Sequence, residues 1–301
     1  MHLVIQCRRG VSLIEVVIVI GVLAIVGALL MPLVQAGREA ARRTQCANQL
    51  REIGLGILQF EGAKNHLPGN GGWDGRQTIE AKDGSRLAVR TYDIWTKQTF
   101  HWGVGDPARG GADQTGSWAF QILPHLDRGE QYRGRAWMNP VATYACPTRR
   151  QAEAKLAADD QWANYFGGGW EWAKTDYAAN EFVVLPRPRN MFREQITDGL
   201  AQTVLAGEKA MHMPGYSSGS WYWDEPFFLG GSGGTARSGN VVLLDADATD
   251  ITIQRNWGSA HAAGANFLFA DGSVRLLKHG TDSITLAALL TPKSRDFPGE
   301  F

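Results

Sequence analysis

The sequence lacks an excess of charge of either sign. Lys and Arg together number 30, as do Asp and Glu, so no overall field points to nucleic acid or to a strongly charged partner. Helical periodicity is also scarce over most of the chain. Gly is abundant at 36 residues and Trp at 11, which favours strands and long loops over a helical bundle. The apolar content of 44% is ample for a hydrophobic core and excludes a disordered chain.

Long hydrophobic runs are few as well, and the sequence has one, at residues 11–34 (VSLIEVVIVIGVLAIVGALLMPLV). At about 1.5 Å per residue, this run reaches about 36 Å as a helix, enough to cross a bilayer core of about 30 Å. Arg8 and Arg9 precede it, which places the N-terminus in the cytoplasm. We therefore expect a single-pass membrane helix and an exported C-terminal part.

One charged residue, Glu15, interrupts this run. A carboxylate near the centre of a span costs about 2.5–3.5 kcal/mol, and less towards its end. A plain signal anchor leaves that cost unexplained, and so does a signal peptide cleaved before Gly37. Cleavage between Gly10 and Val11 would explain it. The new α-amino group of one subunit would pair with Glu15 of a neighbour in a helical polymer.

The residues around that bond have a familiar order. Residues 8–15 read Arg-Arg-Gly-Val-Ser-Leu-Ile-Glu, which resembles the type IV prepilin leader. The resemblance implies that prepilin peptidase cleaves after Gly10 and that Val11, where the family usually has Phe, becomes the methylated first residue. It also implies that Glu15 acts in assembly with other copies or other pilin-like subunits.

Helical periodicity returns beyond the span. The apolar residues there are spaced 4, 3, 4 and 3 apart: Cys46, Leu50, Ile53, Ile57 and Phe60. This spacing predicts one apolar stripe on a helix. We divide the chain into a leader (1–10), a transmembrane helix (11–34), an amphipathic continuation of that helix (35–64) and an exported β-rich head (65–301).

Cysteines are few, namely Cys7, Cys46 and Cys146. Removal of the leader would leave two, and an even pair in an exported protein favours one disulfide. Such a bond would close a loop of about 100 residues and contribute about 4.7 kcal/mol in the chain-entropy model. Two buried free thiols are the alternative.

The head contains a predicted hairpin at residues 264–277. Asp271-Gly272 is a two-residue turn signal, which would pair Phe269 with Val274 on a core face. His261, nine residues and Asp271-Gly272 also form a signature. With the segments 175–181 and 196–210, it resembles a planctomycete family of pilin-like proteins of unknown function. The resemblance implies an α+β, type II pseudopilin-like architecture and an envelope location, with no demonstrated activity.

Residues 215–219 match the G-x-S-x-G pattern of a hydrolase nucleophile. Ser217, Asp245 or Asp247, and His261 even follow in the chain order of an α/β-hydrolase triad. The elbow requires a strand before the serine and a helix after it, and Met213-Pro214 and the following residues favour neither. We therefore expect no enzyme activity, with an anchored serine hydrolase as a minor alternative.

Metal sites are weakly indicated. Asp245, Asp247 and Asp250 are spaced as oxygen ligands for Ca²⁺, but a solvated acidic turn is the simpler interpretation. His261 is expected to be a structural donor, and the other histidines show no zinc-type spacing. We expect no cofactor. The overall expectation is a structural subunit of a pilus or pseudopilus, the alternative being an anchored ligand-binding head in the periplasm.

Overall fold

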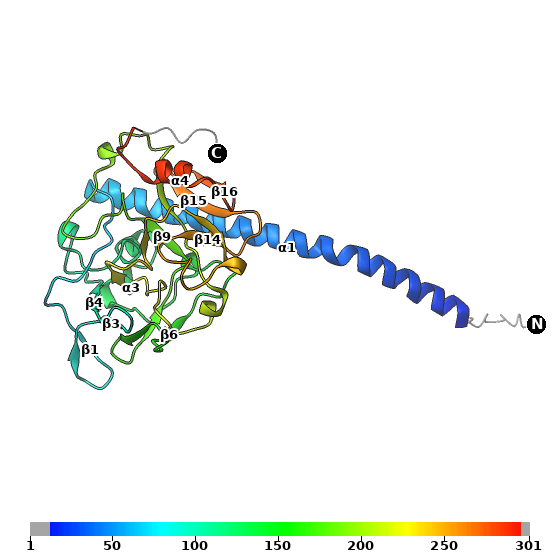
Figure 1. Ribbon diagram of the computed structural model, residues 1–301, viewed down its shortest axis with the longest axis horizontal. Coiled ribbons are helices and arrows are strands. Elements are labelled where there is room, and N and C mark those ends of the chain that lie inside the picture. Colours follow the sequence, from blue (N-terminus) through cyan, green and yellow to red (C-terminus); the bar gives the residue numbers. More distant parts are fainter. Residues whose placement is uncertain (1–12, 296–301) are drawn as a thin grey trace, which may run out of the picture. The chain divides into compact units, whose positions relative to one another are not determined.

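The computed structural model describes residues 13–295 (Figure 1). The predicted processing residues, Gly10 and Val11, lie outside this range. The chain divides into two units, the first running to Arg42 and the second beginning at Arg43. Each is described separately below, and the second contains the β-rich head.

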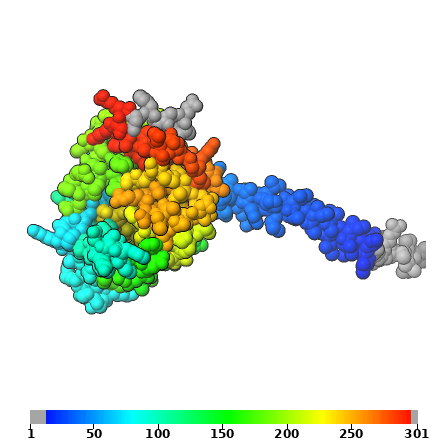
Figure 2. All heavy atoms as spheres, in the orientation of Figure 1, coloured from blue at the N-terminus to red at the C-terminus, as the bar shows by residue number. Residues whose placement is uncertain are grey.

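The first unit is the N-terminal part of helix α1 (Leu13–Lys64). Its large apolar side chains from Leu13 to Val34 are exposed, and Figure 2 shows this part of the helix in blue with its side chains bare. Within residues 13–295, α1 is the one helix long and apolar enough to cross a membrane. By length and composition, a membrane anchor and a signal sequence both meet this test.

The second unit begins with the remainder of α1. All five residues of the predicted stripe, Cys46, Leu50, Ile53, Ile57 and Phe60, are buried, which confirms the periodicity. The helix ends at Lys64, where Asn65 adopts a left-handed φ of 58° and its N–H donates to the Glu61 carbonyl. A long apolar helix packed against a β-rich region confirms the predicted α+β class.

The sheet on which the helix packs has five strands, in the order β12-β9-β10-β15-β16. Its strands are β9 (Tyr177–Asn180), β10 (Val204–Glu208), β12 (Ala236–Arg237), β15 (Ala265–Phe269) and β16 (Val274–Leu277). The β12–β9 pair is parallel and the other pairs are antiparallel. A bulge between Val204 and Ala206 shifts the register of β10 against β15.

The two faces of this sheet are covered by different helices. Leu268 of β15 belongs to the main core with the α1 stripe, and a Cβ added to Gly54 would lie 2.7 Å from its Cδ1. Phe267 and Phe269 point to the opposite face, where they pack with α4 (Ser283–Leu290). The alternation of side chains along a strand explains this division.

The predicted hairpin forms, but its register is wrong by one residue. Leu268, rather than Phe269, lies opposite Val274, and Phe269 N–H donates to the Ser273 carbonyl. The loop has three residues because Gly272 adopts a φ of 88° and forms the bulge that follows a type I turn. Asp271 serves the turn as expected, since its Oδ1 accepts from the Ser273 N–H.

The rest of the head consists of short elements joined by loops. Three pairs are antiparallel: β1 (Ile79–Glu80) with β2 (Arg86–Leu87), β5 (Gly103–Val104) with β11 (Leu229–Gly230), and β6 (Ala154–Leu156) with β8 (Glu171–Ala173). A three-stranded sheet has the order β4 (Thr99–His101), β3 (Arg90–Asp93), β7 (Ala163–Phe166). The last pair, β13 (Val242–Leu244) with β14 (Trp257–Ser259), is parallel.

Short helices complete the head: α2 (Trp118–Gln121), α3 (Gly129–Gly134) and the 3₁₀ turns η1 (Gly111–Asp113), η2 (Leu123–Leu126), η3 (Ala142–Tyr144), η4 (Arg193–Gln195), η5 (Met213–Tyr216) and η6 (Asp245–Asp247). In Figure 2, the surface of this unit brings together colours far apart on the sequence bar. Such non-local packing needs many loops to be held in place.

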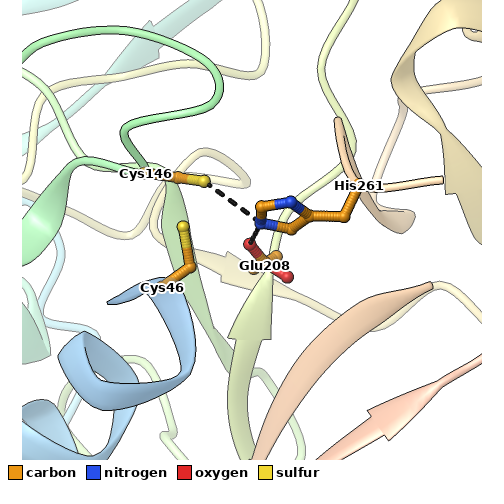
Figure 3. Close-up of side chains that lie close together, drawn as sticks. All are labelled: Cys46, Cys146, Glu208 and His261. Carbon is orange, nitrogen blue, oxygen red and sulfur yellow. Dashed lines mark hydrogen bonds and ion pairs between the residues drawn. The ribbon is translucent and has the colours of Figure 1, made fainter. Parts of the chain in front are cut away.

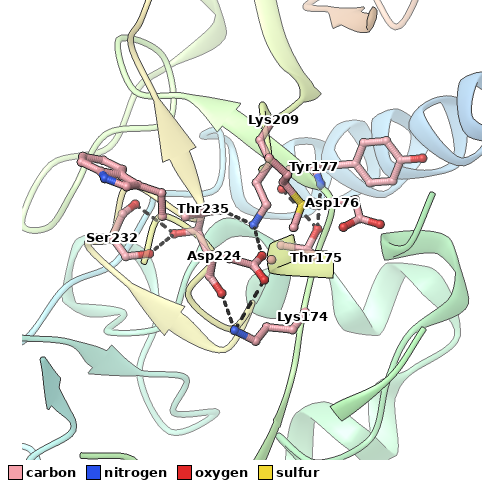
Figure 4. Close-up of polar contacts among 12 residues, drawn as sticks. Lys174, Thr175, Asp176, Tyr177, Lys209, Asp224, Ser232 and Thr235 are labelled. Carbon is pink, nitrogen blue, oxygen red and sulfur yellow. Dashed lines mark hydrogen bonds and ion pairs between the residues drawn. The ribbon is translucent and has the colours of Figure 1, made fainter. Parts of the chain in front are cut away.

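A buried network of charged groups joins several of these loops (Figure 4). Asp224 accepts from Arg150 and from Lys209 Nζ, the latter at 2.7 Å, and Lys174 Nζ donates to its carbonyl. Burial lowers the pKa of Lys174 and of Lys209 to about 8, although the Asp224 carboxylate opposes this. The groups are paired, so their burial does not leave an isolated charge.

Candidate metal centre

Four side chains that are distant in sequence meet inside the head (Figure 3). They are Cys46 on α1, Cys146 just after η3, Glu208 at the end of β10 and His261 between β14 and β15. Each is at most 1% exposed, and one ligand atom from each lies within 4.8 Å of the other three. We call this set the Cys-Cys-Glu-His cluster.

The backbone around the cluster is held by hydrogen bonds. The Cys146 N–H donates to Asp176 Oδ2 at 2.7 Å. The His261 N–H donates to Ser259 Oγ at 3.1 Å, and the His261 carbonyl is 2.7 Å from His279 Nε2. Cys46 needs no such support, because the stripe on α1 already turns it into the core. Cys46, Cys146 and His261 are therefore each held in place by their own segment.

Glu208 presents its two oxygens differently. Oε2 accepts from Asn266 N–H at 2.6 Å and from Asn266 Nδ2 at 3.0 Å. Oε1 has no hydrogen-bond partner among the described residues and lies 3.4 Å from His261 Nε2. The same imidazole nitrogen is 3.5 Å from Cys146 Sγ. Nε2 thus lies between a carboxylate oxygen and a thiol.

The predicted disulfide is wrong for this structure, in which Cys46 and Cys146 are both free and buried. The pairing correctly anticipated that the two residues meet, but they meet as members of a larger cluster. The Cys146 sulfur faces His261 Nε2, and its contact with Cys46 together with burial raises the pKa of its thiol. In apolar surroundings a thiol stays protonated unless a cation is near.

The three aspartates proposed for Ca²⁺ do not come together. Asp245 is buried and accepts from Arg149 Nε at 2.7 Å, whereas Asp247 is exposed. Asp250 Oδ1 lies 3.0 Å from His212 Nδ1. Within residues 13–295 the Cys-Cys-Glu-His cluster is the one group of three or more such side chains with converging ligand atoms. The spacing of the aspartates along the chain was therefore misleading.

The three residues of the suspected hydrolase triad also have other roles in the structure. Ser217 follows the 3₁₀ turn η5 rather than a strand. Asp245 is engaged by Arg149 and by the Tyr216 hydroxyl, and His261 belongs to the Cys-Cys-Glu-His cluster. The local geometry that a nucleophile elbow requires is missing at Ser217.

Sequence reasoning missed Glu208 altogether. It ends the strand-like segment TVLAGE, where a carboxylate usually marks an exposed strand end. Cys46 and His261 are 215 positions apart, so no short zinc motif connects them. The available signal was that two segments of the family resemblance, residues 196–210 and the His261 signature, contain Glu208 and His261.

One comparison with known proteins gives a result. A family model described as a protein of unknown function (DUF1559) matches residues 35–284, which include the whole Cys-Cys-Glu-His cluster but not the apolar run before residue 35. No curated protein and no solved structure matches the chain. The match covers most of the sequence, and the chain therefore belongs to the DUF1559 family of proteins of unknown function.

Proposed function

We propose that this protein is a pilin-like structural subunit anchored in the bacterial inner membrane. Its leader would be removed after Gly10, and its head would face the periplasm. The observation that carries the proposal is the change along α1 from exposed apolar residues to a buried stripe. A subunit of a pseudopilus requires one helix part for lipid or neighbouring helices and another for its own head.

The leader residues and Glu15 supply the second support. Glu15 opens the apolar part of α1, in its first turn. Because a carboxylate is costly among apolar neighbours, its presence favours a specific partner. The amino group created by cleavage before Val11 is such a partner, and it comes from the adjacent subunit in a filament.

Glu15→Ala tests this role in the full chain. We expect the variant to fractionate with membranes like the wild type but to lose the multimers that a chemical cross-linker captures. Glu39→Ala is the matched control, because Glu39 lies on the same helix beyond the apolar run and forms a half-exposed ion pair with Arg42. Undiminished multimers of Glu15→Ala would refute polymerisation through this residue.

An anchored head that binds a ligand without polymerising is a second candidate. It is favoured by a cavity of about 340 Å³ lined by aromatic and polar side chains, among them Trp162, Tyr222, His212 and Asp250. The Trp162 and Tyr222 rings stack with centroids 5.1 Å apart. Concave sites that combine apolar walls with a few polar groups are typical of small-molecule binding. Glu15→Ala should leave ligand binding by such a head unchanged.

A further inference from the structure

We propose that the Cys-Cys-Glu-His cluster binds one zinc ion, which fastens the C-terminal part of α1 to the head. The proposal is independent of polymerisation. It starts from convergence: a helix, a sheet strand and two loops each contribute one ligand-type side chain to one buried point (Figure 3). Two cysteines, one histidine and one carboxylate are all established zinc ligands.

Two of the separations within the cluster match those around a tetrahedral zinc ion. With Zn–S bonds of about 2.3 Å and Zn–N or Zn–O bonds of about 2.0–2.1 Å, the edges of the tetrahedron are about 3.6 Å for S···N and about 3.4 Å for N···O. Cys146 Sγ and His261 Nε2 are 3.5 Å apart, and His261 Nε2 and Glu208 Oε1 are 3.4 Å apart. Both edges therefore already have the length that a bound zinc ion requires.

The surroundings of Glu208 suit a carboxylate that binds a cation. Its side chain is fully buried, yet Oε1 has no hydrogen-bond partner among the described residues and is directed at the centre of the cluster. Burial of a carboxylate is costly unless it is paired or binds a metal. Asn266 holds the other oxygen and so fixes the orientation of Glu208, as outer-shell partners of metal ligands do.

The donor atoms favour zinc over other common ions. Ca²⁺ and Mg²⁺ prefer sets made of oxygen ligands, which this cluster does not offer. A set of two sulfurs, an imidazole nitrogen and one oxygen is typical of zinc. Four protein ligands, each at most 1% exposed, leave no open position for a substrate. The site is therefore structural, and its ion would connect Cys46 on α1 with three segments of the head.

The first test measures zinc in the full chain, purified in detergent without chelators. We expect one zinc ion per chain by elemental mass spectrometry. Glu208→Gln, His261→Gln and Cys146→Ser should each lower the zinc content at least tenfold. The matched controls are His212→Gln and Asp250→Asn, a contacting histidine and carboxylate outside the cluster. They should retain the full amount of zinc.

A second test uses the wild-type protein, so its result does not depend on whether the variants fold. Wild-type protein stripped of metal is titrated with Co²⁺, and thiolate-to-cobalt absorption should appear and saturate at one equivalent. The zinc-loaded form should also melt at a higher temperature than the stripped form. Equal melting temperatures or no cobalt–thiolate absorption would overturn the proposal.

Thiol chemistry separates the remaining outcomes. A zinc site keeps Cys46 and Cys146 reduced, so both should react with a thiol reagent after unfolding without a reductant. A mass lower by two hydrogen atoms, with no bound zinc, would show a disulfide and overturn the proposal. Free thiols without zinc, or one equivalent of another metal in its place, would overturn it as well. None of these readouts depends on cleavage of the leader.

Discussion

The two parts of helix α1 differ in how their apolar residues are arranged. From Leu13 to Val34 nearly every residue is apolar, and the large side chains are exposed. From Cys46 to Phe60 apolar residues recur on one side and are buried in the head. A helix that is apolar all round suits lipid or other helices, whereas a single stripe suits one packed face. One continuous element thus combines two surfaces with different requirements.

The largest effect should come from truncating the buried stripe. Ile53→Ala removes a fully buried side chain, so we expect the free energy of unfolding of the head to fall by about 2–5 kcal/mol. Leu55→Ala, two residues away and 59% exposed, should change it by less than about 0.5 kcal/mol. Urea denaturation followed by tryptophan fluorescence reports the head alone, since all 11 tryptophans lie at or after residue 73.

Equal losses for Ile53→Ala and Leu55→Ala would contradict the packed stripe. It would mean that the stability of the head does not depend on which side of α1 is truncated between Cys46 and Phe60.

Glu225 is a carboxylate buried in the head, whereas Glu15 lies in the apolar run of α1. Burial raises the pKa of Glu225 from 4.5 to about 7. The folded state holds this proton more tightly, so its stabilising contribution is complete below pH 4.5 and disappears as pH rises to about 7. The free energy of unfolding should therefore fall by up to about 3 kcal/mol across that range through this group.

Denaturation curves of the wild type and Glu225→Gln between pH 4.5 and 7 provide the check. The difference between the two proteins isolates this residue from other titrating groups. We expect the pH slope of the variant to be more positive by as much as about 1.4 kcal/mol per pH unit. Parallel curves would show that Glu225 titrates at its ordinary pKa.

The smallest of the three effects concerns close approach between α1 and the sheet. A Cβ at Gly54 would lie 2.7 Å from Leu268 Cδ1, so overpacking in Gly54→Ala should cost about 1–3 kcal/mol, offset in part by a gain in helix propensity of up to about 1 kcal/mol. Gly62 lies on the same helix with nothing within 4 Å of an added Cβ. Gly62→Ala should therefore stabilise the helix by up to about 1 kcal/mol. The same urea assay measures both, and effects of equal sign would contradict the predicted contact.

Periodicity explains why the helix was the most predictable part of the fold. The stripe from Cys46 to Phe60 follows from local sequence alone. The hairpin at 265–277 was found from its turn residues, but its register was not. Asp-Gly suits both a two-residue turn and a three-residue loop with a bulge, and the choice depends on packing of the flanking strands.

The candidate site was predictable only in part. The two cysteines were expected to meet, and His261 was recognised as part of a signature, but nothing local joined them to Glu208. A strand-end carboxylate is normally exposed, and the burial of Glu208 results from its sheet pairing with Tyr177 of β9 and from its hydrogen bonds with Asn266 of β15. Ligands assembled from four segments give no spacing pattern, so their convergence is visible only in three dimensions.

The central claim is that α1 is the helix of a processed, pilin-like subunit, and the N-terminus of the mature chain tests it most directly. Mass spectrometry of the N-terminal peptide from membrane-purified protein should find a chain that starts at Val11 with a methylated amino group. A chain that starts at Met1, or at Gly37 after signal-peptide cleavage, would contradict the claim.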